Sequence, residues 1–170
     1  MKNKKVFESI INIKNLKIGE GKPTFFIAEI ASNFDRDLKR AKDLIFAAKE
    51  AGADVAKFQH YSAETLVSDY GFKNLKINSS HQNTWKKSVF ETYKKASLNP
   101  DWTHELYETC KKANIIFMTS PYSIELTDYV ERFVPAFKIG SGDITWHEEI
   151  KHIAKKKKAS FLSNRSILDR

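Results

Sequence analysis

The sequence contains little cysteine, glycine and proline, and it has no long hydrophobic run. Its single cysteine, Cys110, excludes a disulfide-bonded scaffold and is typical of a reducing compartment. Six glycines and four prolines among 170 residues exclude collagen-like and low-complexity chains. The apolar stretch at 6–13 contains Glu8 and is followed by Lys14, which is unlike a secretory signal, and no stretch approaches the roughly 20 apolar residues of a membrane span. We therefore expect a cytoplasmic protein with no membrane partner.

Acidic residues are fewer than basic ones, and the net charge of +8 is the most unusual figure of the composition. A basic protein often binds nucleic acid or another polyanion. However, residues 1–22 contain six lysines and two glutamates (+4), and residues 151–170 contain seven basic residues and one aspartate (+6). The remaining segment, 23–150, has 16 basic and 18 acidic residues (−2). We therefore expect no nucleic-acid partner, and a non-catalytic basic binding module is kept as an alternative.

Short apolar runs alternate with amphipathic segments from residue 25 onward. The runs have the composition of buried strands and lie at 25–30, 55–59, 115–119, 136–140 and 160–162. Segments with helical spacing lie between them, at 37–51, 83–96, 102–113, 123–133 and 146–157. This alternation predicts an α/β protein with a parallel sheet, either doubly wound or a (β/α)8 barrel, and the missing GxGxxG motif weakens the dinucleotide-binding version. Residues 1–24 precede the alternation and are expected to form a hairpin or cap.

Polar side chains stand at the end of every predicted strand. They are Glu29 with Asn33, Lys57 with Gln59, Ser120, Lys138 with Ser141 and Asp143, and Ser163. The carboxyl ends of parallel strands meet at one edge of the sheet, where ligands bind. Because lysine is rarely buried without a partner, Lys57 and Lys138 either form structural ion pairs with Glu29 and Asp143 or converge with the serine hydroxyls on a phosphate or carboxylate. A Schiff-base aldolase that uses Lys57 or Lys138 is a further alternative.

The order and spacing of these motifs resemble the sialic acid (N-acetylneuraminate) synthase family. The resemblance covers roughly residues 22–163, and its matching runs are 28–30 with Asn33, 51–54, 57–59, 117–122 and 134–143. It implies a (β/α)8 TIM-type barrel of which this chain holds about the first five strands, in residues 25–170, with 1–24 as a cap segment. The second half of the barrel and the C-terminal antifreeze-like domain are expected to be absent from the chain.

The resemblance also implies an activity. Members of this family condense phosphoenolpyruvate with the open-chain aldehyde of an N-acylated amino sugar, N-acetylmannosamine or a diacetamido-trideoxy hexose, to form a nine-carbon 2-keto acid. By position, Glu29 is the catalytic residue at the aldehyde. Phosphoenolpyruvate is held by Lys57, Ser120, Lys138, Ser141 and Ser163, and the sugar by Gln59, Asp143 and Asn33. The family uses Mn²⁺ or Mg²⁺, whose ligands are expected beyond Arg170. We therefore expect the chain to be inactive alone and to associate as a homodimer or with a complementary C-terminal half.

The chain departs from the family pattern at several positions. Ala31 and Arg36 replace glycines of the first motif, Phe34 replaces its histidine, and Arg165 replaces a glycine after the fifth strand. The other residues with chemical potential are expected to be structural or solvated: Cys110 as a half-buried helix residue, Trp85, Trp102 and Trp146 as packing residues, and His60, His147 and His152 as solvated side chains.

Overall fold

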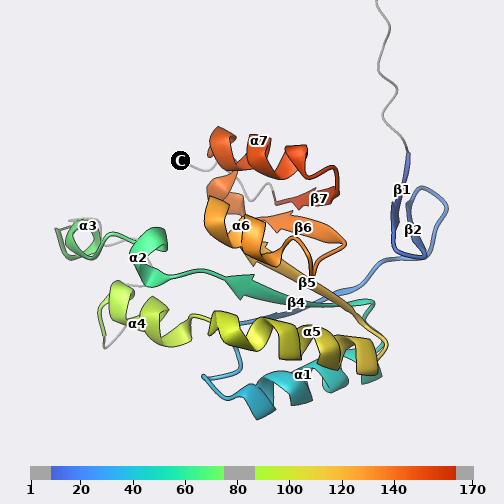
Figure 1. Ribbon diagram of the computed structural model, residues 1–170, viewed down its shortest axis with the longest axis horizontal. Coiled ribbons are helices and arrows are strands. Elements are labelled where there is room, and N and C mark those ends of the chain that lie inside the picture. The colour runs from blue at the N-terminus through green and yellow to red at the C-terminus, as the bar shows by residue number, and fades with distance from the viewer. Residues whose placement is uncertain (1–8, 75–86, 164–170) are drawn as a thin grey trace, which may run out of the picture.

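The computed structural model describes residues 9–74 and 87–163, and its centre is a parallel five-stranded sheet (Figure 1). The strands follow one another in chain order: β3 (Ile27–Ala31), β4 (Val55–His60), β5 (Ile116–Pro121), β6 (Ala136–Ile139) and β7 (Ala159–Leu162). This confirms the α/β alternation and the parallel sheet. Within the described part of the chain, β3 and β7 are the two edges and do not pair, so the sheet is not a closed barrel.

Four helices pack on one face of the sheet and form the main core with it. They are α1 (Leu38–Glu50), α5 (Thr103–Lys112), α6 (Ile124–Val130) and α7 (His147–Lys155). Their apolar residues, such as Ile45 and Leu106, form one buried cluster with Phe58, Phe117 and Phe137 of the strands. Among the described residues, no helix has the length and apolar character needed to cross a membrane.

The connection from β4 to α5 contains more structure than the sequence predicted. It holds α2 (Ala63–Leu66), α3 (Asp69–Asn74), α4 (Val89–Ala96) and the 3-10 turn η2 (Pro100–Trp102). The single helix predicted at 83–96 begins at 89, because Ser88 and Glu91 form a reciprocal capping box there. Positions 83–86, and Trp85 with them, lie outside the described residues. Helices as short as α2 contain too little periodicity to be recognised from sequence.

A hairpin packs against the other face of the sheet, which we call the inner face. Strands β1 (Ile10–Ile13) and β2 (Leu16–Gly19) pair in antiparallel fashion. Ile13 is buried in a second apolar cluster with Val55, Met118 and Ala136 of the central strands. In Figure 1 the hairpin lies at one end of the sheet, while α2, α3 and α4 lie at the opposite end, where the central strands finish. The hairpin therefore covers the apolar residues of the inner face near the amino-terminal ends of the central strands.

Two positions where the family pattern has glycine adopt a left-handed backbone in this chain. Ala31 has φ of +50° at a register shift of β3, and Arg36 has φ of +60° in the loop that leads to α1. A side chain in this conformation costs roughly 1 kcal/mol relative to glycine. Glycine is favoured at these two positions of the family pattern because it adopts a positive φ without strain. In this chain, Ala31 and Arg36 adopt the same backbone conformation with strain.

We expect Ala31→Gly to raise the free energy of unfolding by about 0.5 to 1 kcal/mol, because glycine adopts the same φ without steric strain. Urea unfolding measures the change. The matched control is Ala47→Gly on the exposed face of α1, which should lower stability by about 1 kcal/mol because its backbone is helical. An equal decrease in the free energy of unfolding for both variants would show that the backbone of Ala31 is not strained.

Candidate functional site

The candidate site lies on the inner face, at the carboxyl edge of the sheet. Side chains along a strand alternate between faces, so residues two or four positions beyond Val55, Ile116 and Ala136 share their face. These residues are Lys57 and Gln59 on β4, Ser120 on β5 and Lys138 on β6. Strand pairing places Glu29 beside Lys57, and Gln59 beside Ser120. A layer of polar residues thus lies next to the apolar cluster, toward the carboxyl ends of the strands.

Lys57 is the most buried cation of this layer. Its side chain is 7% exposed, and its ammonium forms an ion pair with the carboxylate of Glu29, which is 50% exposed. One of the two ion pairs considered from the sequence is therefore present. An ammonium has three donors, so Lys57 retains the capacity to bind a ligand anion while it holds Glu29.

Lys138 is held differently. Its Nζ donates hydrogen bonds of 2.6 Å to Ser163 Oγ and of 2.6 Å to the backbone oxygen of Ile139. Burial lowers the pKa of Lys138, and the positive charge of Lys57 lowers it further. The Lys138–Asp143 ion pair considered from the sequence is not formed. The structure therefore brings two cations and the Ser163 hydroxyl together at this edge.

Asp143 belongs to the 3-10 turn η3 (Ser141–Asp143), directly after β6. Its Oδ2 is buried and has no hydrogen-bond partner among the described residues, and burial raises the pKa of its carboxyl. Gly140 permits this packing, because a Cβ there would lie 2.6 Å from Asp143 Oδ2 and 3.2 Å from the Tyr122 ring. Ser141, the first residue of the turn, is half-buried.

The structure does not place Asn33 beside Lys57 and Lys138. Its side chain is exposed in the loop between β3 and α1, and its backbone oxygen accepts a 2.9 Å hydrogen bond from Arg40 Nε. The adjacent Phe34 is fully buried and packs against Phe58 and Trp102. The position where the family has a histidine therefore carries a core aromatic residue in this chain.

The structure contradicts the prediction for His60. We expected a solvated loop side chain, but His60 is 1% exposed, lies in β4 and points to the helix-covered face. Its Nδ1 lies 2.8 Å from Thr119 Oγ1, and its Nε2 lies 2.8 Å from Thr103 Oγ1. Burial lowers the pKa of His60 to about 3. The residue joins β4, β5 and α5 beneath the site and does not face a ligand.

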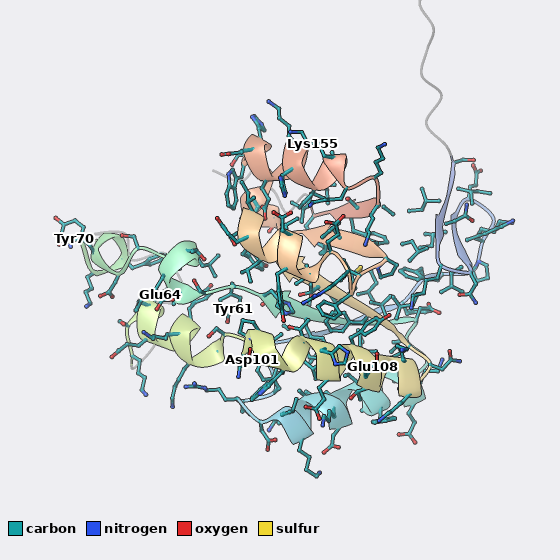
Figure 2. All side chains as sticks on the ribbon, viewed as in Figure 1. Tyr61, Glu64, Tyr70, Asp101, Glu108 and Lys155 are labelled. Atoms are coloured by element: carbon teal, nitrogen blue, oxygen red, sulfur yellow. The ribbon has the colours of Figure 1, made fainter. Side chains whose placement is uncertain are left out.

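Three tyrosines at this end of the molecule were missed from the sequence. Tyr61 lies between the end of β4 and α4 (Figure 2), and its hydroxyl is 3.2 Å from Ser32 Oγ. Its ring contacts those of Tyr93 and Tyr122, at centroid distances of 5.6 and 6.1 Å. Burial, with the nearby charge of Asp143, raises the pKa of Tyr122 to about 12. Tyr61 and Tyr122 each directly follow a strand, which is the signal that could have identified them.

Other candidate groups do not contribute to this edge. In the described ranges, no three His, Cys, Asp or Glu side chains are grouped so that they could hold a metal ion. The described residues therefore offer no site for the divalent metal, whose ligands the resemblance placed beyond Arg170. Cys110 is 1% exposed, more buried than expected, and burial raises the pKa of its thiol to about 12. A thiol of this kind stays protonated at neutral pH and is a poor nucleophile.

The site and fold define an α/β protein with a parallel sheet whose carboxyl edge carries two lysines and serine hydroxyls. A sequence profile described as the NeuB family matches residues 44–164. The N,N'-diacetyllegionaminic acid synthase of Campylobacter jejuni is 35% identical over 146 residues, covering 84% of this chain and 42% of that protein. The pseudaminic acid synthase of the same species is 32% identical over 144 residues, covering 84% and 41%. The crystal structure of N-acetylneuraminic acid (sialic acid) synthetase from Leptospira borgpetersenii, in complex with citrate, matches with a TM-score of 0.78 at 25% identity, over 94% of this chain and 51% of that chain.

The chain belongs to the NeuB family. This confirms the resemblance drawn from the motifs around the strand ends. The chain spans 41% and 42% of the lengths of the two curated relatives named above.

Proposed function

We propose that this chain forms the phosphoenolpyruvate-binding part of a NeuB-family synthase with a TIM-type barrel, which acts in the cytoplasm. The observation that carries the proposal is the position of Lys57 and Lys138, on one face of the sheet and close enough that one charge lowers the pKa of the other. Two like charges held this near each other are unfavourable unless an anion or acidic side chain compensates them. Glu29 compensates Lys57, and a bound anion would compensate Lys138.

The proposed residue roles follow from the chemistry of phosphoenolpyruvate, which carries both a phosphate and a carboxylate. Lys57 and Lys138 would neutralise these groups, and the hydroxyls of Ser120, Ser141 and Ser163 would donate hydrogen bonds to them. Ser120 is 2% exposed on the inner face, and Ser163 already accepts from Lys138, so both side chains are pre-positioned.

Glu29 would act on the second substrate, an N-acylated amino-sugar aldehyde. Its carboxylate is half exposed in the middle of β3. When C3 of phosphoenolpyruvate attacks the aldehyde carbon, the aldehyde oxygen gains a proton, which Glu29 would hold or deliver. Water then adds at C2 and phosphate leaves. Gln59, Asp143 and Asn33 would contact the sugar, and N-acetylmannosamine and diacetamido-trideoxy hexoses both remain acceptor candidates.

The edges of the described sheet suggest how the site would be completed. Strands β3 and β7 each have one unpaired side among the described residues, and such edges pair readily with further strands. We infer that the polypeptide of 170 residues is inactive by itself and requires a complementary segment or a second copy to close the barrel. A family metal would be bound by residues of that complementary part.

Phosphoenolpyruvate binding tests the proposal. Titration calorimetry should detect binding to the unaltered chain, and Lys57→Met and Lys138→Met should each weaken it at least tenfold, the usual effect of losing a charge-assisted hydrogen bond. Lys151→Met, an exposed lysine on α7, is the matched control and should bind normally. Adding N-acetylmannosamine should release no inorganic phosphate. No binding by the unaltered chain at millimolar phosphoenolpyruvate would overturn the proposal.

The Schiff-base alternative is favoured by one observation, the lowered pKa of Lys138. A Schiff-base lysine needs such a pKa to attack a keto acid. Borohydride reduction in the presence of pyruvate separates the two functions, because it labels a lysine irreversibly only if an imine forms. We expect no label on Lys57 or Lys138, and stoichiometric labelling of either residue would replace the proposed function by an aldolase.

A further inference from the structure

A groove lined by lysines lies at the amino end of the sheet, and we call it the amino-end groove. It consists of two hollows, of about 410 and 260 Å³, which share Asn15, Leu16 and Asp54 as lining residues. The larger hollow alone has a volume typical of ligand sites, which is roughly 300 to 1,000 Å³. The lysines of the groove are Lys14, Lys49 and Lys111 in the larger hollow, and Lys17 and Lys22 in the smaller one.

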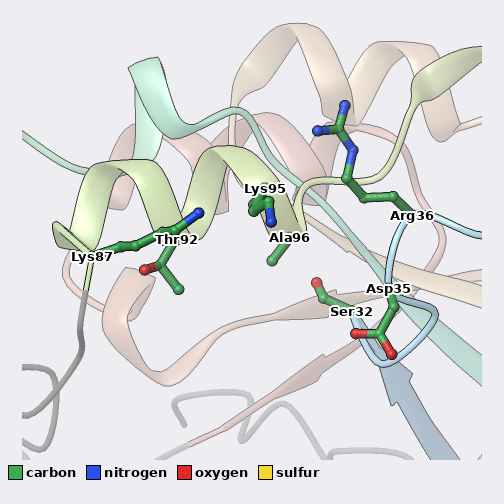
Figure 3. A pocket seen from close by; sticks show the side chains of 7 residues that line it. All are labelled: Ser32, Asp35, Arg36, Lys87, Thr92, Lys95 and Ala96. Atoms are coloured by element: carbon green, nitrogen blue, oxygen red, sulfur yellow. The ribbon is translucent and has the colours of Figure 1, made fainter.

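The amino-end groove is separate from the candidate site. Asp54 directly precedes β4 and Ile116 begins β5, so the groove lies at the opposite end of these strands from the layer of polar residues. A different pocket, of about 350 Å³, lies at the carboxyl end, where Figure 3 shows the loop after β3 facing helix α4. The amino-end groove shares no lining residue with that pocket, and none of its residues has a role in the proposed function.

Most of the positive charge in the groove is uncompensated. Four of its lysines form no ion pair among residues 9–74 and 87–163: Lys14, Lys17, Lys22 and Lys49. Lys111 pairs with Glu108 at 3.0 Å. The carboxylate of Asp54 accepts a 2.8 Å hydrogen bond from the backbone nitrogen of Phe26 and forms no ion pair in the same ranges. Several unpaired cations around one concave surface concentrate a field that favours a multiply charged anion.

The charge of the hairpin segment has no structural reason of its own. Lys49 and Lys111 lie in the last turns of α1 and α5, where the helix dipole favours cations. Lys14 lies instead in the two-residue connection of the hairpin, with a φ of +53° that glycine or asparagine would adopt more easily. A strained residue that persists is a reason to look for a function. Three groove lysines also belong to the basic segment 1–22, whose charge the proposed function leaves unexplained.

The surroundings of these lysines favour a chain of phosphates over a nucleic acid. Surfaces that bind single-stranded nucleic acids present aromatic rings on which bases stack. The ring of Phe25, which lines the groove, is half-buried and already stacks on Phe161 at a centroid distance of 6.0 Å. Lysine binds phosphate as a compact point charge. A short polyphosphate carries several charges within the length of such a groove, and therefore matches closely spaced lysines.

We propose that the amino-end groove binds a polyphosphate, either inorganic or the triphosphate group of a nucleotide. Lys14 and Lys17 belong to the hairpin, whereas Lys49 and Lys111 belong to α1 and α5. A ligand that contacts both sets holds the hairpin against the body of the protein, where Ile13 packs on the central strands. The inference is independent of the proposed function, because it uses none of the residues assigned there.

Titration calorimetry with sodium tripolyphosphate at physiological salt tests the groove. The unaltered chain should bind, and the double variant Lys14→Gly with Lys49→Gln should bind at least tenfold more weakly, since each substitution removes a charge-assisted contact. Glycine suits the positive φ at position 14, so weaker binding would not reflect unfolding. Lys112→Gln is the matched control, because Lys112 is an exposed lysine at the end of α5 that does not line the groove. It should bind like the unaltered chain.

Thermal unfolding gives a second readout and identifies the source of the phosphates. Tripolyphosphate at about 100 times its Kd should raise the Tm of the unaltered chain by about 5 °C or more. The same concentration should leave the Tm of the double variant nearly unchanged. ATP is then compared with tripolyphosphate by calorimetry. Equal or weaker binding of ATP assigns the groove to inorganic polyphosphate, and tighter binding assigns it to a nucleotide.

Lys138→Met separates this inference from the proposed function. It should weaken phosphoenolpyruvate binding and leave tripolyphosphate binding unchanged, while the double variant should do the reverse, so that either site can fail alone. The groove is overturned as a polyphosphate site if millimolar tripolyphosphate does not bind, if the double variant binds it normally, or if Lys138→Met abolishes its binding. Binding of duplex DNA without binding of tripolyphosphate would also overturn it, in favour of a nucleic-acid surface.

Discussion

Replacing His60 by alanine should lower the free energy of unfolding by about 4 kcal/mol, because it creates a cavity and leaves hydroxyls unpaired in the core. Thr103 Oγ1 donates a 2.6 Å hydrogen bond to the backbone oxygen of Pro100, so it must accept from His60 Nε2–H. Nδ1 then carries no proton and accepts from the Thr119 hydroxyl. The neutral ring is thus matched to both partners in one tautomer. Its loss would leave the hydroxyl of Thr119 as a buried donor without an acceptor.

The same environment makes the protein sensitive to acid. The pKa of His60 is about 3 in the folded chain, against an ordinary value of 6.5. Between these values the unfolded chain binds a proton that the folded chain does not. The neutral ring of His60 therefore contributes fully to the free energy of unfolding above pH 6.5. This contribution is lost progressively as the pH falls toward 3, and the total loss is up to about 5 kcal/mol.

Urea unfolding between pH 7.5 and 4 measures this effect. His60→Gln, which has no titrating ring, should lose less stability on acidification than the unaltered chain, although it starts from a lower value. His104→Gln removes an exposed histidine of α5 and should follow the unaltered chain throughout. Parallel curves for His60→Gln and the unaltered chain would show that His60 is not the acid-sensitive group.

Replacing Glu149 by glutamine should stabilise the protein above neutral pH by about 2 to 3 kcal/mol. Glu149 lies on α7, is 1% exposed, and its Oε1 has no hydrogen-bond partner among the described residues. Burial, with the nearby charge of Asp143, raises its pKa to about 7 from an ordinary 4.5. Between these values the folded chain holds a proton that the unfolded chain has released. Stability from this group is therefore present at low pH and is lost as the pH rises to about 7.

Unfolding at pH 5 and pH 8 separates this contribution from that of His60, which has the opposite sign. Glu149→Gln and the unaltered chain should differ little at pH 5 and by about 2 to 3 kcal/mol at pH 8. Glu148→Gln, an exposed neighbour on the same helix, should change stability by less than about 0.5 kcal/mol at either pH. A Glu149→Gln advantage that is equal at both pH values would contradict the assignment.

Much of the fold and part of the site could be predicted from local patterns. Apolar runs locate the five strands, of which the three central ones, β4, β5 and β6, are buried on both faces. Lys57 and Lys138 stand out in the sequence because lysine is rare in such runs. His60 could not be assigned in this way. Whether it ends a strand or begins a loop depends on its pairing with Pro121 in β5, which is remote in the chain. The tyrosines were missed because their roles arise from contacts with one another across different connections.

The sequence by itself determined the order of the five sheet strands and of the four helices that pack on them, the family, and the residue types available at each strand end. Only the tertiary structure decided which of those residues share a face. Side chains alternate between the two faces of a strand, but which set faces the helices is known only once the helices pack on one side of the sheet. It placed Glu29 beside Lys57 and turned His60 to the opposite face. It also brought Arg36 and Lys95 to one pocket, since residues so far apart in the chain can meet only through the packing of α4 against the loop after β3.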